Sequence, residues 1–231
     1  MHTWRADLSR VPRYFDRLAR VLSDSERERA ARFHFQHDAT RWVMSRVVLR
    51  SILGQYLDVE PQIVRFRVGR WGKPELAAPF ERNRLEFNAS HSDELGLFAV
   101  AGSRRVGVDI ERLRSVPDLE AIAERMFSPA ERYALGGLPR ADRQAAFFSC
   151  WTRKEAYVKA LGAGFSYPLQ RFTVSLTRDA PARLEDVQDH PAEAERWSLA
   201  ELPAAPGYAA ALAVEGRPAR LVHRHWQEPA L

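Results

Sequence analysis

The stretch WTRKEAYVKALG, residues 151–162, carries two of the three lysines of this chain, Lys154 and Lys159. The third is Lys73, and every other basic residue among the 35 is an arginine. On a helix, Glu155 and Lys159 are spaced i, i+4 and therefore share one face. A chain so rich in arginine keeps lysine in few places, so these positions are candidates for a role that an ammonium fills and a guanidinium does not.

Two interpretations of this helical face remain open. Trp151 precedes Glu155 by one turn, and aromatic neighbours favour partial burial, where an unpaired charge is costly. In one interpretation Glu155 and Lys159 form a plain ion pair on a solvated face, worth about 0.2–0.5 kcal/mol. In the other, Glu155 is an oxygen ligand or a base, and Lys159 faces a phosphate.

Length and composition indicate a globular protein of one large domain or two small ones. The chain has 231 residues, of which 45% are hydrophobic and 28% charged. No apolar run approaches the roughly 18 residues of a membrane span, and the N-terminus lacks the apolar region of a signal peptide. The single cysteine, Cys150, excludes an internal disulfide framework and fits a reducing cytosol. We therefore predict a cytoplasmic protein that does not enter a membrane.

The chain is also basic. Its net charge of +5 and pI near 9.7 predict an acidic partner. Nucleic acid, a phosphorylated ligand and an acidic protein all satisfy this expectation, and charge alone does not distinguish them.

The first half of the chain predicts helices followed by strands. Ser23 and Glu26 form a capping box that opens two helices over residues 23–57. The pattern of apolar residues then predicts strands, the last two of which form a hairpin that turns at Gly102 and Ser103. These strands cover residues 63–68, 84–90, 95–102 and 105–111.

The second half repeats this order of helices and strands. DLEAIAERMF is helical, SPAE (128–131) is a second capping box, and a long helix runs from about Arg140 to Gly162 and Gly164. Strands are predicted for FTVSLT, RWSLAEL, GYAAALAV and ARLVHRHW. We therefore predict an α+β fold, a pseudo-dimer of two similar α/β lobes that pack tightly as one unit, residues 1–111 and 112–231.

VGVDIE places three apolar residues on one face of a strand and Asp109 and Glu111 on the other. Two carboxylates on one strand face lie about 7 Å apart, because each residue rises about 3.3 Å. This spacing suits a shared hard cation such as Mg²⁺, which takes one or two carboxylates and then phosphate oxygens. The alternative is the solvated polar face of an edge strand.

Four other polar positions are candidates with weaker patterns. FNASHS (87–92) is predicted as a loop between strands where a polar cluster can meet a ligand, and His91 is either a structural hydrogen-bonding residue or a catalyst. His223 and His225 form an HxH pattern without a nearby third ligand, so we predict surface residues. Cys150 lies within an apolar helix and is predicted to pack rather than to act as a nucleophile.

WGKP, FNASHS, VGVDIE and WTRKEAYVKALGAG, in this order across residues 71–164, resemble the Sfp-type 4′-phosphopantetheinyl transferases. Each motif alone is weak, whereas four in register are specific. The resemblance implies transfer of 4′-phosphopantetheine from coenzyme A to a serine of an acyl or peptidyl carrier protein, with Mg²⁺ and with release of adenosine 3′,5′-bisphosphate. It also implies a monomeric pseudo-dimer with the active site between its two lobes.

The resemblance further implies a role for each matching residue. The expected metal ligands are Asp109, Glu111 and Glu155. Glu155 is also the expected base for the attacking serine, and Lys159 is expected to face the pyrophosphate. The expected contacts with coenzyme A are Lys73, Ser90, His91, Arg41 on the 3′-phosphate, and Arg29 in the first helix.

These roles give a reason for two of the lysines, Lys73 and Lys159. A compact ammonium enters a crowded pyrophosphate site where a planar guanidinium imposes its own geometry. We therefore expect Lys159→Arg to be strongly impaired. Lys154 points about 100° away from Glu155 and has no role in this scheme, so Lys154→Arg is expected to be tolerated.

Two other classes of function compete with the transferase. One is a basic nucleic-acid-binding module, although the arginines are interleaved with 30 acidic residues and no helix-turn-helix, zinc or RNP signature is present. The other is a metal-dependent phosphohydrolase that uses the same three carboxylates with water as the nucleophile. We predict the transferase, with a carrier protein and no nucleic acid as its partner.

The sequence also predicts where a carrier protein docks. Carrier proteins present an acidic helix beside their serine, as the resemblance implies, and this chain is basic. We expect arginines and an apolar patch after Glu111, around Met126 and Phe127 at the exposed end of a short helix. The sequence identifies neither the carrier and its pathway nor a preference for free over acylated coenzyme A.

Overall fold

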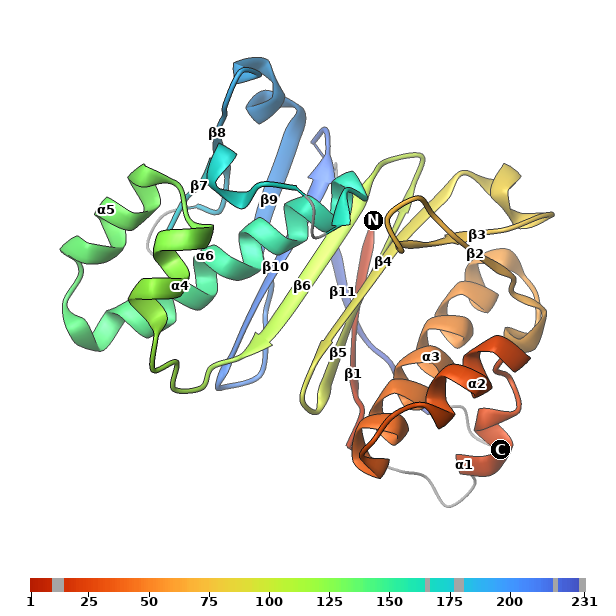
Figure 1. Ribbon diagram of the computed structural model, residues 1–231. Coiled ribbons are helices and arrows are strands. Elements are labelled where there is room, and N and C mark those ends of the chain that lie inside the picture. The colour runs from red at the N-terminus through yellow and green to blue at the C-terminus, as the bar shows by residue number, and fades with distance from the viewer. Residues whose placement is uncertain (10–14, 165–166, 177–180, 218–219, 229–231) are drawn as a thin grey trace.

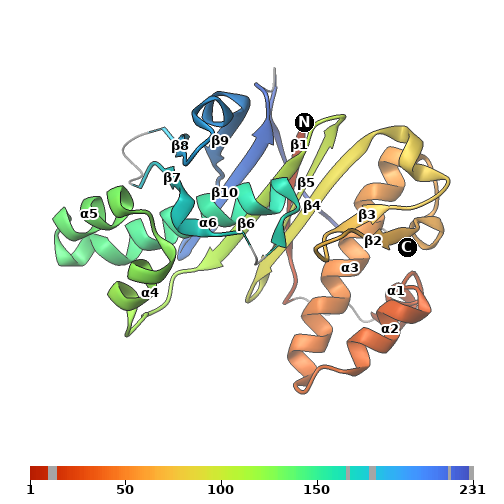
Figure 2. The same ribbon diagram turned by 45° about the horizontal axis from the view of Figure 1, so that its top comes forward.

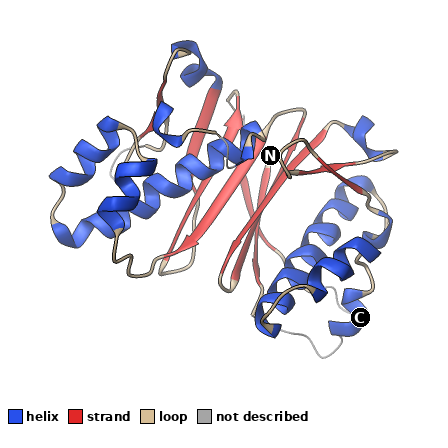
Figure 3. Ribbon diagram, in the orientation of Figure 1, coloured by secondary structure: helices blue, strands red, loops and turns tan. Residues whose placement is uncertain are grey.

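Two sheets lie back to back at the centre of the molecule, and helices cover their outer faces (Figures 1 and 3). The computed structural model describes residues 1–9, 15–164, 167–176, 181–217 and 220–228. The helices are α1 Phe15–Ala19, α2 Asp24–Ala31, α3 Gln36–Leu57, α4 Leu119–Met126, α5 Pro129–Gly137 and α6 Arg140–Leu161. The strands are β1 His2–Asp7, β2 Phe66–Val68, β3 Pro74–Leu76, β4 Leu85–Ser92, β5 Leu95–Gly102, β6 Val106–Arg112, β7 Phe172–Val174, β8 Leu184–Val187, β9 Trp197–Glu201, β10 Tyr208–Glu215 and β11 Val222–His225.

Within the described residues, the larger sheet has the strand order β11-β1-β5-β4, and the second has the order β6-β10-β9. All neighbours are antiparallel except β1 and β11, which are parallel. The predicted helices and most predicted strands are present. The strands β1, β3 and β8 were not predicted. FTVSLT and ARLVHRHW extend into residues outside the described ranges, and their described parts hold β7 and β11.

The predicted hairpin of residues 95–102 and 105–111 is wrong. β5 hydrogen-bonds with β1 and β4, whereas β6 hydrogen-bonds with β10 in the other sheet. The reason is that β5 is apolar on both faces. Phe98 and Val100 pack on the α3 side, whereas Leu97 and Ala99 pack against the apolar face of β6. The two strands therefore meet face to face rather than edge to edge.

The sheets do not follow the predicted division of the chain at residue 111. β6 precedes that position and pairs with β10, whereas β11 lies near the C-terminal end and pairs with β1. Each half of the sequence thus contributes a strand to the sheet of the other half. The lobe boundaries remain a prediction.

Helix α6 lies unusually close to β6. A Cβ built on Gly107 would stand 2.1 Å from Ala156 O and 2.4 Å from Ala160 N, so only glycine fits at this point of the strand. Alanines of β10 line the same contact, and Figure 2 shows α6 crossing over β6 and β10. This approach brings the side chains of α6 next to those of β6.

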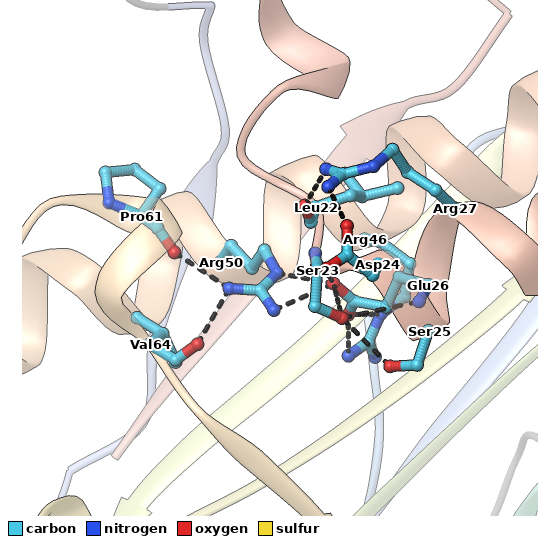
Figure 4. Close-up of polar contacts among 10 residues, drawn as sticks. All are labelled: Leu22, Ser23, Asp24, Ser25, Glu26, Arg27, Arg46, Arg50, Pro61 and Val64. Carbon is cyan, nitrogen blue, oxygen red and sulfur yellow. Dashed lines mark hydrogen bonds and ion pairs between the residues drawn. The ribbon is translucent and has the colours of Figure 1, made fainter.

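A buried glutamate joins α2 to α3 (Figure 4). Glu26 caps α2 through the predicted capping box with Ser23 and is only 8% exposed. Its carboxylate accepts hydrogen bonds from Arg46 and Arg50, each at 2.8 Å. Burial alone would raise the pKa of Glu26, but the two guanidiniums and the Ser23 backbone amide lower it below its ordinary value. The cap that the sequence predicts is therefore also a tertiary contact.

Candidate active site

Side chains of β4 hold the two sheets together. Asn88 Oδ1 accepts a hydrogen bond from Val108 N at 2.9 Å, and Ser90 Oγ donates to Asp109 Oδ1 at 2.9 Å. Ser92 Oγ donates to Glu111 Oε2 at 2.8 Å. The predicted strand of residues 84–90 is confirmed as β4, and it continues through Ser92, so FNASHS lies in the strand and not in a loop after it. Its alternate residues face β6, which lies beside β4 in both views (Figures 1 and 2).

Lys159 reaches this line of side chains from α6. Its Nζ lies 2.6 Å from Asp109 Oδ1 and 2.9 Å from Ser90 Oγ. The Lys159 side chain is 30% exposed, whereas that of Asp109 is only 4% exposed. Asp109 therefore lies buried between β4, β6 and α6. The ammonium covers one of its oxygens and remains partly open to solvent.

The predicted face of α6 is confirmed by its burial pattern. In the stretch Trp151–Ala160, the residues Trp151, Glu155 and Lys159 are half-buried, and the others are buried. Their spacing of four residues aligns them along one side of the helix. The interpretation as a solvated ion pair is therefore wrong, since Lys159 pairs with Asp109 on another element.

Three carboxylates in this region repel one another. Burial raises the pKa of Asp109, and the hydrogen bonds from Lys159 and Ser90 oppose this effect. The pKa values of Glu111 and Glu155 are also raised, first by burial and then by the charge of Asp109. Asp109 Oδ2 is buried and has no hydrogen-bond partner among the described residues. The cluster therefore carries more negative charge than Lys159 alone neutralises.

A pocket of about 200 Å³ opens beside Glu155 and Lys159. Its other wall is the turn that contains Trp71 and Lys73. Lys73 Nζ donates a hydrogen bond to Val106 O at 3.1 Å, at the start of β6. Burial lowers the pKa of Lys73. The two motifs WGKP and WTRKEAYVKALG, far apart in sequence, thus line one pocket.

His91 and Arg41 extend the site toward α3. His91 is exposed at its surface, yet the protein packed around its ring lowers its pKa, and the charges of Lys159 and Arg41 lower it further. Arg41 forms an ion pair with Asp93, with 2.8 Å between Nη1 and Oδ1. Arg29 lies in the last turn of α2, and its guanidinium stacks over Trp42, 5.6 Å from the ring centroid. Of the two predicted arginines, Arg41 is the one that the structure brings next to His91.

The comparisons with known proteins cover nearly the whole chain. Residues 3–103 match the 4′-phosphopantetheinyl transferase N-terminal family, and residues 105–213 match the 4′-phosphopantetheinyl transferase superfamily. The chain is 42% identical over 216 residues to the 4′-phosphopantetheinyl transferase HetI of Nostoc sp., over 94% of this chain and 88% of HetI. This chain belongs to the 4′-phosphopantetheinyl transferase family.

Two Bacillus relatives agree with this assignment. The 4′-phosphopantetheinyl transferase psf-1 of Bacillus pumilus is 35% identical over 80% of this chain and 77% of its own length. The 4′-phosphopantetheinyl transferase Sfp of Bacillus subtilis is 30% identical over 76% of this chain and 75% of its own length. The protein is thus an enzyme that transfers 4′-phosphopantetheine to carrier proteins, and its two-domain α+β fold is confirmed. The nucleic-acid and phosphohydrolase alternatives are set aside.

In this transferase Lys154, which had no predicted role, is fully buried. Its Nζ lies 2.7 Å from both carboxylate oxygens of Glu131 and 2.7 Å from Phe172 O. Glu131 is the residue of the second capping box, and it also accepts a hydrogen bond from Ser128 N. Lys154 therefore fastens α6 to α5 and β7.

Cys150 is buried as predicted, and burial raises its pKa far above the ordinary value.

The prediction that Phe127 is exposed and contacts the carrier protein is wrong. It is fully buried and stacks on Phe147, with 5.2 Å between the ring centroids. The described surface instead offers an apolar pocket of about 310 Å³ next to Glu111. Its lining residues include Arg114, Val116, Ile122, Phe148 and Trp151.

Two features are absent from the described residues. As the side chains stand, no group of three or more histidine, cysteine, aspartate or glutamate residues in those ranges is arranged to hold a metal ion. In the same part of the chain, no helix is long and apolar enough to cross a membrane.

Proposed function

We propose that this transferase binds coenzyme A in the pocket between the Trp71 turn and α6, with Mg²⁺ held by Asp109, Glu111 and Glu155. The cluster of three mutually repelling carboxylates around Lys159 carries this proposal. Carboxylate oxygens are the ligands that Mg²⁺ takes beside the oxygens of a phosphorylated substrate.

The residues present fit such an ion. Asp109 Oδ2 is buried without a hydrogen-bond partner in the described part of the chain, which is costly unless a cation or donor meets it. A divalent cation would lower the pKa of all three carboxylates and offset their repulsion. Rotation of the Glu111 and Glu155 side chains, both half-buried, would complete the set.

The chemistry is a displacement at the β-phosphorus of coenzyme A. Mg²⁺ would neutralise charge on the pyrophosphate oxygens. The serine hydroxyl of the carrier attacks the phosphorus, and the bond to adenosine 3′,5′-bisphosphate breaks. Glu155 accepts the serine proton, a role that a carboxylate placed beside the attacking hydroxyl fills as a general base. Lys159 donates to the departing phosphate, since its ammonium is partly open while it holds Asp109.

The remaining predicted contacts concern the nucleotide. We propose that Lys73, Ser90 and His91 hold the phosphates, that Arg41 holds the 3′-phosphate, and that Arg29 contributes from α2. The proximity of His91, Arg41 and Lys159 supports this arrangement, because each lowers the cost of placing an anion among them. Lys73 Nζ donates a hydrogen bond to Val106 O, and Ser90 Oγ donates to Asp109 and accepts from Lys159, so both act from fixed positions.

The partner is an acyl or peptidyl carrier protein, and the enzyme acts as a cytoplasmic monomer. The apolar pocket beside Glu111 supports docking of the carrier there, since it opens next to a proposed metal ligand. The net charge of +5 favours an acidic partner. The buried free thiol of Cys150 fits a reducing compartment.

The decisive experiment incubates the protein with coenzyme A, Mg²⁺ and a panel of apo carrier proteins and measures intact carrier mass. Addition of the phosphopantetheine arm to one or more carriers is expected. Omission of Mg²⁺ and substitution of Asp109 should both abolish it. Transfer that persists with chelator would contradict the metal proposal, and transfer by the Glu155→Gln variant at the wild-type rate would contradict its role as base.

A further inference from the structure

Asp93 holds two arginines from different layers of the molecule. It lies in the turn between β4 and β5, with φ of 51°, a left-handed conformation that aspartate and asparagine tolerate. Its Oδ1 is 2.8 Å from Arg41 Nη1 on α3. Its Oδ2 accepts a hydrogen bond from Arg112 Nη1 at the end of β6. One carboxylate therefore links the proposed nucleotide side of the site to the strand that carries Asp109 and Glu111.

The turn that carries Asp93 is held in place. The neighbouring Ser92 Oγ donates to Glu111 Oε2 at 2.8 Å and accepts from Arg112 N at 3.1 Å. The Asp93 carboxylate therefore stays near the Arg41 guanidinium when an anion binds to Arg41. Its charge remains beside the guanidinium, with Arg112 keeping its second oxygen engaged.

We propose that Asp93 is a specificity-determining residue that weakens the hold of Arg41 on the 3′-phosphate of the nucleotide. This inference rests on the proposed function, in which Arg41 contacts that phosphate. The carboxylate and the phosphate compete for the same guanidinium, so binding of the nucleotide must loosen the pair of Arg41 and Asp93. Asp93 thereby limits how tightly the released adenosine 3′,5′-bisphosphate stays bound.

The size of the effect follows from exposure. The side chains of Arg41 and Asp93 are 26% and 23% exposed, so the pair is partly screened by water. A pair of this kind contributes up to about 1 kcal/mol, which corresponds to about a fivefold change in affinity. If Asp93 were only a structural tie between α3 and β6, its removal would leave nucleotide affinity unchanged or weaken it.

The test measures dissociation constants of adenosine 3′,5′-bisphosphate and of adenosine 5′-monophosphate by calorimetry. Asp93→Asn and Asp93→Gly both suit the left-handed turn and remove the charge. We expect each to bind the bisphosphate about fivefold more tightly and the monophosphate without change. In an Arg41→Gln background the same substitutions should have no effect.

A matched control separates this effect from net charge. Asp189 is also an aspartate with positive φ, at 65°, and it also pairs with an arginine, Arg171, in the turn after β8. Asp189→Asn should leave both dissociation constants unchanged.

The outcomes are distinct. Unchanged or weaker bisphosphate binding by both Asp93 variants, with a loss in Arg41→Gln, overturns the inference and leaves the role of Arg41 intact. If Arg41→Gln does not lower the preference for bisphosphate over monophosphate, the proposed role of Arg41 fails and the inference fails with it. Equal tightening by Asp189→Asn also overturns it.

Discussion

Lys154 Nζ lies 2.7 Å from Glu131 Oε1 and Oε2, and both side chains are buried. Removal of one partner leaves an uncompensated buried charge, which costs about 3–5 kcal/mol. Lys154→Met should therefore lower the free energy of unfolding by that amount in a urea titration. Arg171→Met, which breaks the exposed pair with Asp189, should cost less than about 1 kcal/mol. Equal losses in the two variants would show that burial of the pair is unimportant.

The burial of Lys154 also reverses the expectation that Lys154→Arg is tolerated. The ammonium is surrounded by Glu131, Phe172 O and the Phe172 ring, whose centroid lies 4.2 Å away. A guanidinium is larger, and overpacking costs about 1–3 kcal/mol. We expect Lys154→Arg to lower the unfolding free energy by that amount. An unfolding midpoint and slope equal to the wild type would restore the original expectation.

Glu155 should be needed for the rate and not for the fold. Glu155→Gln keeps the shape of the side chain but removes its charge and its basicity, so kcat should fall at least about 10²-fold. Its unfolding curve should match the wild type or lie above it, because burial of the charged carboxylate is unfavourable. The measurement is initial-rate transfer from coenzyme A beside a urea titration. A parallel loss of stability would mean that Glu155 acts through the structure.

Lys159→Arg should be strongly impaired although the charge is kept. The Lys159 ammonium fits between Asp109 Oδ1 and Ser90 Oγ, at 2.6 Å and 2.9 Å. A planar guanidinium must displace Ser90 or leave Asp109. We expect kcat to fall at least about tenfold with a smaller change in the KM for coenzyme A. A rate near that of the wild type would remove the reason for a lysine at this position.

The parts of the site that were predictable are those set by local spacing. The stripe of Glu155 and Lys159 follows from helical periodicity, and the common face of Asp109 and Glu111 follows from the alternation of a strand. Both hold in the structure. The two capping boxes hold as well, because a cap depends on residues three apart.

The predictions that the structure contradicts concern contacts between segments far apart in the sequence. Lys154 finds Glu131 on another helix, 23 residues away, which no local period can indicate. Phe127 ends a short helix in the sequence, yet α6 covers it with Phe147. β5 and β6 look like a hairpin because they are adjacent, whereas apolar residues on both faces of β5 place them in separate sheets. The polar residues of FNASHS suggested a loop, but Asn88, Ser90 and Ser92 hydrogen-bond with β6 and so join the two sheets.

Acid should weaken the ion pairs that Glu215 forms at the end of β10. Two arginines, Arg105 and Arg196, hydrogen-bond with the Glu215 carboxylate, and they lower its pKa to about 2. A lowered pKa stabilises the folded state fully above the ordinary value of 4.5, and this contribution is lost as the pH falls toward 2. The difference in Tm between the wild type and Glu215→Gln should therefore shrink between pH 5.5 and pH 2.5.

An exposed glutamate of the neighbouring segment is the control for this titration. Glu195→Gln should show a small and pH-independent difference in Tm. A difference for Glu215→Gln that stays constant with pH would show that its ion pairs do not contribute through charge.

Salt and an apolar substitution should both act on carrier recognition. The protein has a net charge of +5, and opposite charge on the carrier raises the association rate, which salt screens over about 8–10 Å. The KM for the carrier should therefore rise with salt much more than kcat falls.

Phe127 no longer serves as the docking probe, because a charge at this buried position would unfold the protein. Ile122 lines the apolar pocket beside Glu111 and is half-buried, so Ile122→Asp should raise the KM for the carrier about tenfold. Ile63→Asp, at a site 51% exposed on the other lobe, should leave it unchanged. A KM for the carrier that responds neither to salt nor to Ile122→Asp would place recognition on another surface.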